Sequence, residues 1–380
     1  MIRIKSDKII LKDKIFSGYV YFEGSTITDV TDKELPYDTE YDFTGKYVSP
    51  GFIDIHTHGG GGFSFDGTSE EIVSAADFHL SHGTTSIFPT VSAAPMEVML
   101  KAGFNIKAAM ESKLSKANII GSHFEGPYLS KKQSGAQCPD FIKSPDKSEY
   151  MPVIEHLGDS VARWTYAPEN DVNQEFCKAL KECGIVPSAG HTDAIYDDMK
   201  IAKENGCNLV THLFSCTSTI TRDHGFRRLG VIETAFLDDD MFVEIIADGK
   251  HLPPELIQLI LKIKGTDKVA LITDSLSLAG TSAKEGIMGA TEYVIEDDVC
   301  KLKDRSAFAG SVATADRLVK VMINEVGVSL VDAIKMLTAV PARIMNLNKG
   351  ELAVGKDADI VVFDDDVNME SVFVMGNKVK

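Results

Sequence analysis

Eight short apolar runs, most of them followed by a stretch with helical periodicity, constrain the fold of this chain more than any other feature. The runs are Phe52–Ile55, Thr84–Phe88, Ile119–Phe124, Arg163–Ala167, Ile185–Ala189, Asn208–Leu213, Val243–Ala247 and Val269–Thr273. Between them, segments such as Ser69–Ser81 and Pro254–Lys264 carry apolar residues at helical spacing. Strand–helix alternation of this kind predicts an α/β protein built on a parallel (β/α)8 barrel. Helices at Thr314–Glu325 and Leu330–Leu337 would complete it.

The two ends of the chain have a different character from this middle part. β-branched and aromatic residues lie between Gly turn signals at Gly18–Gly24 and again at Val372–Gly376. Neither tail is long enough to form a stable sheet alone. We therefore expect residues 1–49 and 350–380 to pair in a small β-sandwich domain, and residues 50–349 to form the barrel.

Composition excludes several classes of protein. Acidic residues outnumber basic ones by 56 to 39, which gives a net charge of −17 and argues against nucleic-acid binding. No apolar stretch approaches the roughly 18 residues of a membrane span, and the N-terminus shows no signal-peptide core. The six cysteines include no CxxC pair. A reduced, cytoplasmic setting without membrane or nucleic-acid partners is the simplest interpretation.

Catalytic residues of a (β/α)8 barrel lie at the C-terminal ends of its strands. Imidazoles and carboxylates follow strands one, three, five, six and eight here, at His56, His58, Glu125, His191, His212 and Asp274. Taken singly, each has an ordinary structural explanation, such as a helix N-cap for Asp274. Together they would converge on one rim, and His56 and His58 alternate so that both can face the same point. These are the donors that zinc, iron or manganese prefers.

This donor set predicts metal-assisted hydrolysis of an amide or a related bond. A bound divalent ion lowers the pKa of its water from 15.7 to about 7 and polarises a carbonyl group. Asp274 could accept the water proton and pass it to a leaving amine. Three protein donors suffice for one ion, whereas His56 and His58 permit a second ion if Glu125 bridges the two. We expect zinc, with iron or manganese as alternatives.

Longer blocks of sequence around these residues carry a family resemblance. They include PGFIDIHTHG at 50–59, GSHFEGPYL at 121–129, AGHT at 189–192, THLF at 211–214, ADGKH at 247–251 and GKDAD at 355–359. Over nearly its whole length the chain resembles the amidohydrolase superfamily and, within it, the N-acetylglucosamine-6-phosphate deacetylases. The resemblance implies a metal-dependent hydrolase that converts an N-acetyl-D-glucosamine 6-phosphate to glucosamine 6-phosphate and acetate in amino-sugar catabolism.

The resemblance also implies a role for each matching residue. Glu125, His191 and His212 match the main metal ligands, His56 and His58 match the ligands of a second ion, and Asp274 matches the catalytic aspartate that also contacts the metal. The expected substrate-binding residues are Ala136, Gln137, Ser215, Cys216, Arg222, Arg227, His251, Phe308, Ala309 and Gly310. The family is generally dimeric, and an arginine after THLF reaches the phosphate in the neighbouring subunit. Arg222 aligns with a shift of one position, and Arg227 and Arg228 are rivals for that role.

Three residues depart from the family pattern and leave alternatives open. Gln137 stands where an imidazole near the acetamide is usual, and Ser215-Cys216 replaces the usual Asn-Ala. The alternative function is therefore a sibling amidohydrolase acting on another N-acyl amino sugar, such as N-acetylgalactosamine 6-phosphate, or on another amide. A non-catalytic sugar-phosphate sensor is a third hypothesis, which the intact metal and acid/base positions disfavour. Cys216 as a nucleophile is disfavoured because no base partner is assured.

Overall fold

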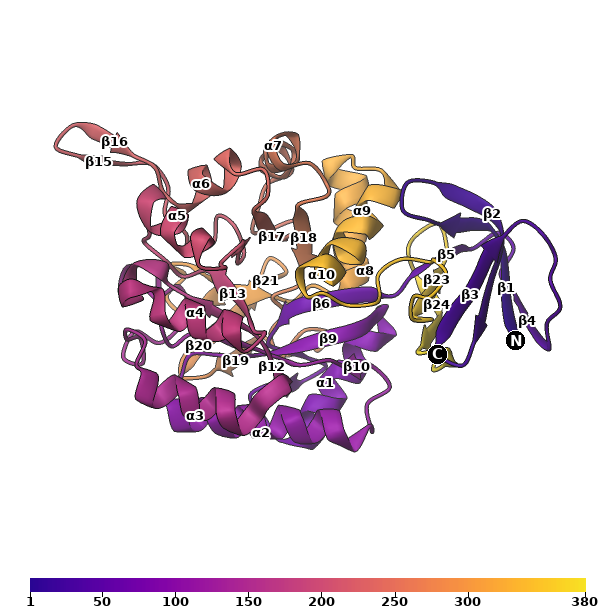
Figure 1. The fold of residues 1–380 in the computed structure, drawn as a ribbon, viewed down its shortest axis with the longest axis horizontal. Helices are drawn as coiled ribbons and strands as arrows, with labels where there is room; N and C mark the ends of the chain where they lie inside the picture. The colour runs from indigo at the N-terminus through magenta and orange to yellow at the C-terminus, as the bar shows by residue number, and fades with distance from the viewer.

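A computed structural model describes all residues of the chain, 1–380, and Figure 1 shows its arrangement. Eight parallel strands form the central barrel, in the spatial order β6, β9, β11, β12, β13, β14, β17 and β18. Their bounds are β6 Phe52–Thr57, β9 Thr84–Val91, β11 Ser122–Glu125, β12 Val161–Tyr166, β13 Val186–Ala189, β14 Leu209–Val210, β17 Phe242–Ile246 and β18 Val269–Ile272. The predicted barrel is confirmed. Two hydrogen bonds join its ends, from Asp274 N to His56 O (3.0 Å) and from His58 N to Ser275 O (2.8 Å).

The helices lie around the outside of the barrel (Figure 1). They are α1 Ser69–Ser81, α2 Met96–Ser112, α3 Lys147–Leu157, α4 Glu175–Glu182, α5 Tyr196–Glu204, α6 Val231–Leu237, α7 Pro254–Lys264, α8 Ala315–Val321, α9 Leu330–Leu337 and α10 Ala339–Ile344. Helices α1, α7 and α9 have the bounds that apolar periodicity predicts. The helix expected at Thr314–Glu325 instead changes to a π-helical turn at Met322–Val326. The longest helix, α2, has 17 residues, and no helix combines the length and apolarity needed to cross a bilayer.

Both ends of the chain contribute to one eight-stranded sheet beside the barrel (Figure 1). Its strands are β1 Ile2–Ile10, β2 Ile15–Glu23, β3 Thr26–Thr31, β4 Thr39–Asp42, β5 Tyr47–Pro50, β23 Ile360–Phe363, β24 Met369–Val374 and β25 Asn377–Lys378. Strand β5 lies between β1 and β23, so the two tails are hydrogen-bonded to each other. Side chains from both tails, among them Val20, Phe22, Val362 and Phe373, share a buried cluster of 11 residues. The pairing of the tails is therefore confirmed.

Two antiparallel elements were not expected from the sequence. A four-stranded sheet follows β18 and consists of β19 Glu285–Met288, β20 Thr291–Glu296, β21 Val299–Leu302 and β22 Phe308–Ser311. A hairpin of β15 Thr221–Asp223 and β16 Phe226–Arg228 projects from the barrel between β14 and α6 (Figure 1). Small β elements follow β6 at β7 Gly59–Gly60 and β8 Phe63–Ser64, and β10 Asn118–Ile119 precedes β11.

Helix α1 supports the loop that follows the first barrel strand. The helix begins with a capping box in which Glu71 accepts the Thr68 N–H and Thr68 accepts the Glu71 N–H. Near its end, His79 is fully buried and its Nε2 lies 2.9 Å from the carbonyl oxygen of Gly59. Nε2–H must donate to that carbonyl, and Nδ1 has no partner. A second proton would have no acceptor, and burial lowers the pKa of His79 to about 4.

This buried imidazole should make stability depend on pH. Because the pKa is about 4 in the folded chain and about 6.5 when unfolded, the unfolded state binds more protons between these values. Stability from this group is present above pH 6.5 and is lost as the pH falls towards 4, by up to roughly 1.4 kcal/mol per pH unit. His79→Gln, which keeps a donor but cannot titrate, should flatten the slope in urea denaturation. The exposed His156→Gln is the control, and equal slopes for both variants would contradict this assignment.

Candidate active site

The predicted ligands meet around the carboxylate of Glu125. Its Oε1 lies 3.2 Å from His191 Nε2, 3.0 Å from His212 Nε2 and 3.3 Å from His56 Nε2, while its Oε2 lies 3.2 Å from His58 Nε2. Two groups of three donors therefore share one glutamate, and each group is compact enough to hold a cation. All five side chains are buried, with exposures of 5% or less. The five residues come from four different strands, as the barrel topology requires.

Asp274 lies beside the same centre. Its Oδ1 is 3.6 Å from His56 Nε2 and 3.5 Å from His58 Nε2. The residue follows β18 and has a positive φ of 46°, and His191 and His212 likewise have φ values of 47° and 29°. Non-glycine residues adopt this region at a cost of roughly 1–3 kcal/mol each, which the surrounding structure must offset. Strain gathered at three strand ends is typical of a functional site.

The hydrogen bonds of the imidazoles direct their Nε2 atoms towards Glu125. His191 Nδ1 lies 2.9 Å from the carbonyl oxygen of Gln133, and His212 Nδ1 lies 3.1 Å from that of Ser215. A carbonyl can only accept, so each neutral ring is protonated at Nδ1 and presents a lone pair at Nε2. That lone pair faces a carboxylate oxygen at 3.0–3.2 Å, a contact that is favourable only with a proton or a cation between the atoms. Both ring nitrogens of the buried His56 also lack a hydrogen-bond partner. These donors fit divalent cations.

The neighbouring charges in the site determine how the pKa values of His56 and Glu125 are shifted. Burial would lower the pKa of His56, but the carboxylates of Glu125, Glu244 and Asp274 close to the ring outweigh burial and raise the pKa to about 10. Burial likewise opposes ionisation of Glu125, yet His56 and His191 hold its pKa well below the usual range. Glu125 therefore stays ionised, and the positive charge of His56 beside it compensates its own charge. A bound cation would take over that compensation.

The cavity over this centre has a volume of about 240 Å³. Eight of the predicted substrate-binding residues line it: Ala136, Gln137, Ser215, Cys216, His251, Phe308, Ala309 and Gly310. His251 is oriented by a bond from its Nδ1 to Asp248 (2.9 Å) and packs edge-on against Phe308, with ring centroids 5.0 Å apart. Met288 also lines the cavity, and it was missed because the sheet that carries it was not predicted.

The predicted arginines lie elsewhere. Arg222, Arg227 and Arg228 are exposed on the β15–β16 hairpin, which points away from the barrel (Figure 1). Among the 17 residues that line the cavity there is no lysine or arginine. A single subunit therefore brings together the expected metal ligands and eight of the expected substrate-binding residues, with no lysine or arginine among them.

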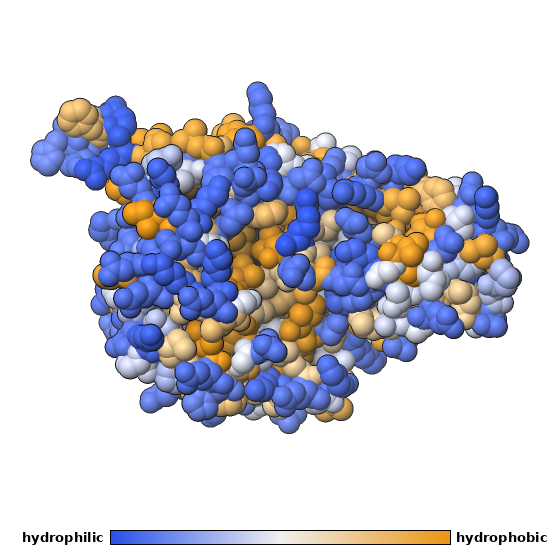
Figure 2. Space-filling model, in the orientation of Figure 1, coloured by the Kyte–Doolittle hydropathy of each residue, from blue (hydrophilic) through white to orange (hydrophobic).

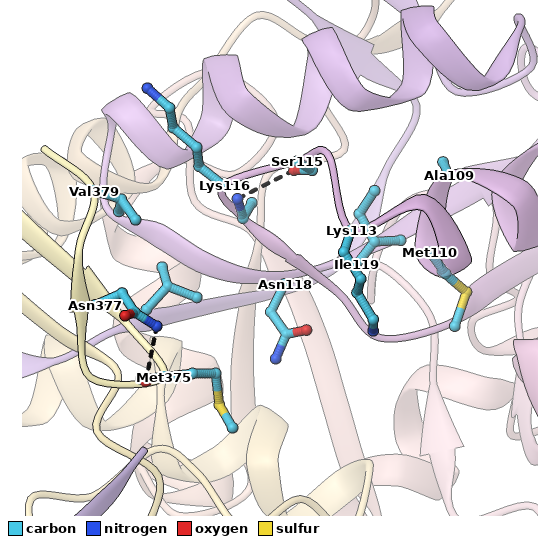
Figure 3. A pocket seen from close by; sticks show the side chains of 12 residues that line it. Ala109, Met110, Lys113, Ser115, Lys116, Asn118, Ile119, Met375, Asn377 and Val379 are labelled. Atoms are coloured by element: carbon cyan, nitrogen blue, oxygen red, sulfur yellow. Dashed lines mark hydrogen bonds between the residues drawn. The ribbon is translucent and has the colours of Figure 1, made fainter. Parts of the chain in front are cut away.

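A second cavity is larger but lacks the groups for this chemistry. Its volume is about 300 Å³, and it lies where the end of α2 and the segment leading to β10 meet the β24–β25 hairpin. Figure 3 shows the side chains that line it, among them Met110, Asn118 and Met375. None of its residues is a histidine, cysteine, aspartate or glutamate. The candidate catalytic centre is therefore the cavity of about 240 Å³ at the strand ends.

A buried ion pair lies beneath the metal ligands. Arg163 on β12 and Glu244 on β17 are both fully buried and are linked by two hydrogen bonds. Arg163 also donates to the Ile55 carbonyl (3.1 Å) and to Ser188 Oγ (3.1 Å), while Glu244 Oε2 lies 3.6 Å from His56 Nδ1. The pair thus connects the barrel interior to the first metal ligand.

The fold and the site together define a class of enzyme, barrel hydrolases that act through divalent metal. The chain matches the model of the Amidohydrolase family over residues 47–379. It is 31% identical to the N-acetylglucosamine-6-phosphate deacetylase of Bacillus subtilis (strain 168), covering 98% of this chain and 96% of that protein. It is also 31% identical to the N-acetylgalactosamine-6-phosphate deacetylase of Shewanella sp. (strain ANA-3), covering 96% and 90%.

A solved structure agrees with these matches. A mutant N-acetyl-D-glucosamine-6-phosphate deacetylase from Mycobacterium smegmatis, in complex with N-acetyl-D-glucosamine-6-phosphate, superposes with a TM-score of 0.92. It is 28% identical and covers 100% of this chain and 99% of its own. The chain belongs to the amidohydrolase family and is a hydrolase that acts on an amide bond.

Loss of the Glu244 charge should destabilise the barrel strongly. Glu244→Gln keeps the shape of the side chain but leaves the Arg163 guanidinium buried without a counter-charge, which costs about 3–5 kcal/mol. The measurement is the free energy of unfolding from urea titration. Asp240→Asn removes a carboxylate that lies 3.9 Å from Lys268 at the surface and should cost less than about 1 kcal/mol. Similar losses for both variants would refute the importance of the buried pair.

Proposed function

We propose that this enzyme removes the acetyl group from N-acetyl-D-glucosamine 6-phosphate, giving glucosamine 6-phosphate and acetate. The observation that carries the proposal is the Glu125 carboxylate shared by two imidazole pairs, His191/His212 and His56/His58, with Asp274 within 3.6 Å of the second pair. Several relatives named for this activity, at about 30% identity over most of the chain, support the choice of substrate. The reaction belongs to amino-sugar catabolism, and we place the protein in the cytoplasm because its six cysteines are all free.

In this proposal His191, His212 and Glu125 would hold one divalent ion, and His56 and His58 with Glu125 would hold a second. Zinc suits imidazole and carboxylate donors best among the candidates. When bound, the metal polarises the acetamide carbonyl and makes a nearby water more acidic. The chain's own residues supply the remaining functions: binding, orientation and proton transfer.

Asp274 is the proposed general base and acid. Its carboxylate accepts a proton from the water that attacks the acetamide carbonyl, and then returns that proton to the sugar nitrogen as the C–N bond breaks. His251 is fixed by Asp248 through Nδ1, so its Nε2 is available to bind the substrate at the other side of the cavity. Phe308, Ala309, Gly310, Ser215 and Cys216 enclose the sugar.

The phosphate requires a second copy of the chain. Because the cavity is lined without lysine or arginine, we infer a homodimer in which the hairpin arginines, Arg222, Arg227 or Arg228, reach the partner's site. Figure 2 shows the hairpin standing clear of the body with a less polar group at its otherwise hydrophilic end. Phe226 is 78% exposed at this tip and Ile220 is 51% exposed at its base. Apolar side chains so exposed are suited to burial against a partner.

The Shewanella relative supports a second candidate substrate, N-acetylgalactosamine 6-phosphate, which differs at one hydroxyl stereocentre. Ser215 and Cys216 line the cavity and depart from the usual family residues, so they are candidates for selecting between the two sugars. An acetate-release panel of both phosphorylated sugars and their unphosphorylated forms separates these possibilities.

We expect zinc-loaded protein to release acetate fastest from N-acetyl-D-glucosamine 6-phosphate. Asp274→Asn should retain zinc but lose about 10²–10⁴-fold in kcat, because proton transfer is removed. Acetate is measured by a coupled assay, and Asp240→Asn serves as a surface control. Faster turnover of N-acetylgalactosamine 6-phosphate would replace the first candidate by the second. Turnover that is indifferent to phosphate, or an Asp274→Asn protein with near-normal kcat, would defeat the proposal.

Subunit mixing tests whether the hairpin works across the dimer. One inactive partner carries Asp274→Asn, and the other carries Arg222→Ala, Arg227→Ala and Arg228→Ala together. In a symmetric dimer with arms exchanged, a mixed dimer has one site with an intact Asp274 and an intact arm. Random exchange should therefore restore about a quarter of wild-type activity. Mixing that restores no activity would show that the arms act within one subunit or do not contact substrate.

A further inference from the structure

Gln137 is held at both ends of its side-chain amide. It is 3% exposed, its Nε2 donates to Glu125 Oε2 at 2.6 Å, and its Oε1 accepts the backbone N–H of Ala93 at 2.8 Å. The orientation of the amide is unambiguous, because a backbone N–H can only donate and a carboxylate can only accept. Neither end can bind a substrate without giving up one of these bonds.

The segment that anchors Gln137 also anchors another proposed ligand. Ser92 precedes Ala93 just after β9, and its Oγ lies 3.1 Å from His58 Nδ1. The backbone N–H of Ser92 donates in turn to Asp66 Oδ1 at 3.2 Å. Two consecutive residues thus fix His58 directly and Glu125 through Gln137. Ligands from β6 and β11 are held to one another by a single loop.

The bond to Gln137 determines how the Glu125 carboxylate is rotated. With Oε2 held by the amide, Oε1 faces His191 and His212 at 3.2 and 3.0 Å. A carboxylate oxygen has two lone pairs, so Oε2 can bind a cation beside His58 and still accept from Gln137. We propose that Gln137 is a positioning residue of the metal centre, which holds Glu125 in the rotation that serves both cation positions. This inference rests on the proposed function, because it presumes that the centre binds metal.

The chemistry of the side chain makes the inference specific. The position requires one acceptor for Ala93 and one donor for Glu125, and an amide supplies both. Methionine has a similar length but provides neither, whereas an imidazole again provides one of each. Gln137→Met therefore removes the positioning bonds with little change in volume, and Gln137→His is the conservative variant. Gln258 on α7 provides a matched control, because its amide donates to the carbonyl of Val326 far from the site.

The experiment measures zinc binding first, and then kcat and KM of each zinc-loaded protein. Full-length protein is stripped with chelator and titrated with Zn²⁺ against a chromophoric competitor, for wild type, Gln137→Met, Gln137→His and Gln258→Met. Loss of a bond that orients a ligand typically weakens metal affinity by about 10–100-fold, which we expect for Gln137→Met. The zinc affinity of Gln137→His should stay near that of wild type, and the zinc affinity of Gln258→Met should equal that of wild type. Thermal unfolding of each stripped protein reports any separate loss of stability.

Several outcomes would overturn the inference. A Gln137→Met protein that is less stable when stripped but binds zinc like wild type would make the residue structural. Unchanged zinc affinity with a raised KM would assign Gln137 to substrate binding. If Gln137→His bound zinc as weakly as Gln137→Met, the hydrogen-bond donor and acceptor of the side chain would not be the features that matter. If wild type itself binds no zinc, the proposed function fails, and that result is distinct from all of these.

Discussion

The pairing of Arg163 with Glu244 is the interaction on which the geometry of this enzyme depends. Taking a guanidinium and a carboxylate out of water costs several kcal/mol per ion, so the barrel interior must satisfy them fully. It does so with hydrogen bonds from Arg163 to β6, β13 and the end of β14, at the Ile55 carbonyl, Ser188 and Thr211, besides Glu244 on β17. One side chain on β12 therefore links strands from around the barrel and fixes their register where the ligands emerge.

The same ion pair also acts electrostatically on the candidate metal site, through the contact between Glu244 and His56. Glu244 lies 3.6 Å from His56 Nδ1 on the side away from Glu125, so His56 is placed between two carboxylates. Anionic charge on both sides keeps the imidazole oriented with Nε2 towards the centre. The strained backbone at His191, His212 and Asp274 is tolerated because the strands beneath are so firmly held. Stability in the barrel interior thus offsets strain at its rim.

Much of this arrangement follows from sequence pattern, and the exceptions have physical causes. Buried parallel strands are continuous apolar runs, and in amphipathic helices such as α1 and α7 the apolar residues recur at helical spacing. Both kinds of element can therefore be predicted from the sequence. The sixth strand is expected over Asn208–Leu213, but its regular part covers only Leu209–Val210, because the backbone leaves the extended conformation at His212, where φ is 29°. The residue propensities indicate the apolar run, but they do not indicate the turn that places the His212 ring in the site.

The site was predictable where topology alone brings residues together. Residues at the ends of parallel strands must share a rim, so Glu125 and His191 could be placed together although 66 positions separate them. Met288 could not, because it arrives on an antiparallel sheet whose strands alternate with polar residues and resemble loop sequence. Nor could pattern show that the Gln137 amide turns towards Glu125, since that depends on the position of a single backbone N–H.

The distribution of charge is the physical basis of the proposed dimer. The chain carries a net charge of −17, and its cavity contains the carboxylates of Glu125 and Asp274 with no lysine or arginine. A phosphorylated substrate would meet repulsion in such a cavity unless cations are supplied at both ends. In the proposed function, metal ions supply positive charge at the acetamide, and guanidinium groups of a projecting hairpin supply it at the phosphate. In the proposed dimer the arginines are supplied by the partner's projecting hairpin and not by the lining of the cavity itself. This proposed division lets one small cavity hold both an acidic metal centre and a basic phosphate site.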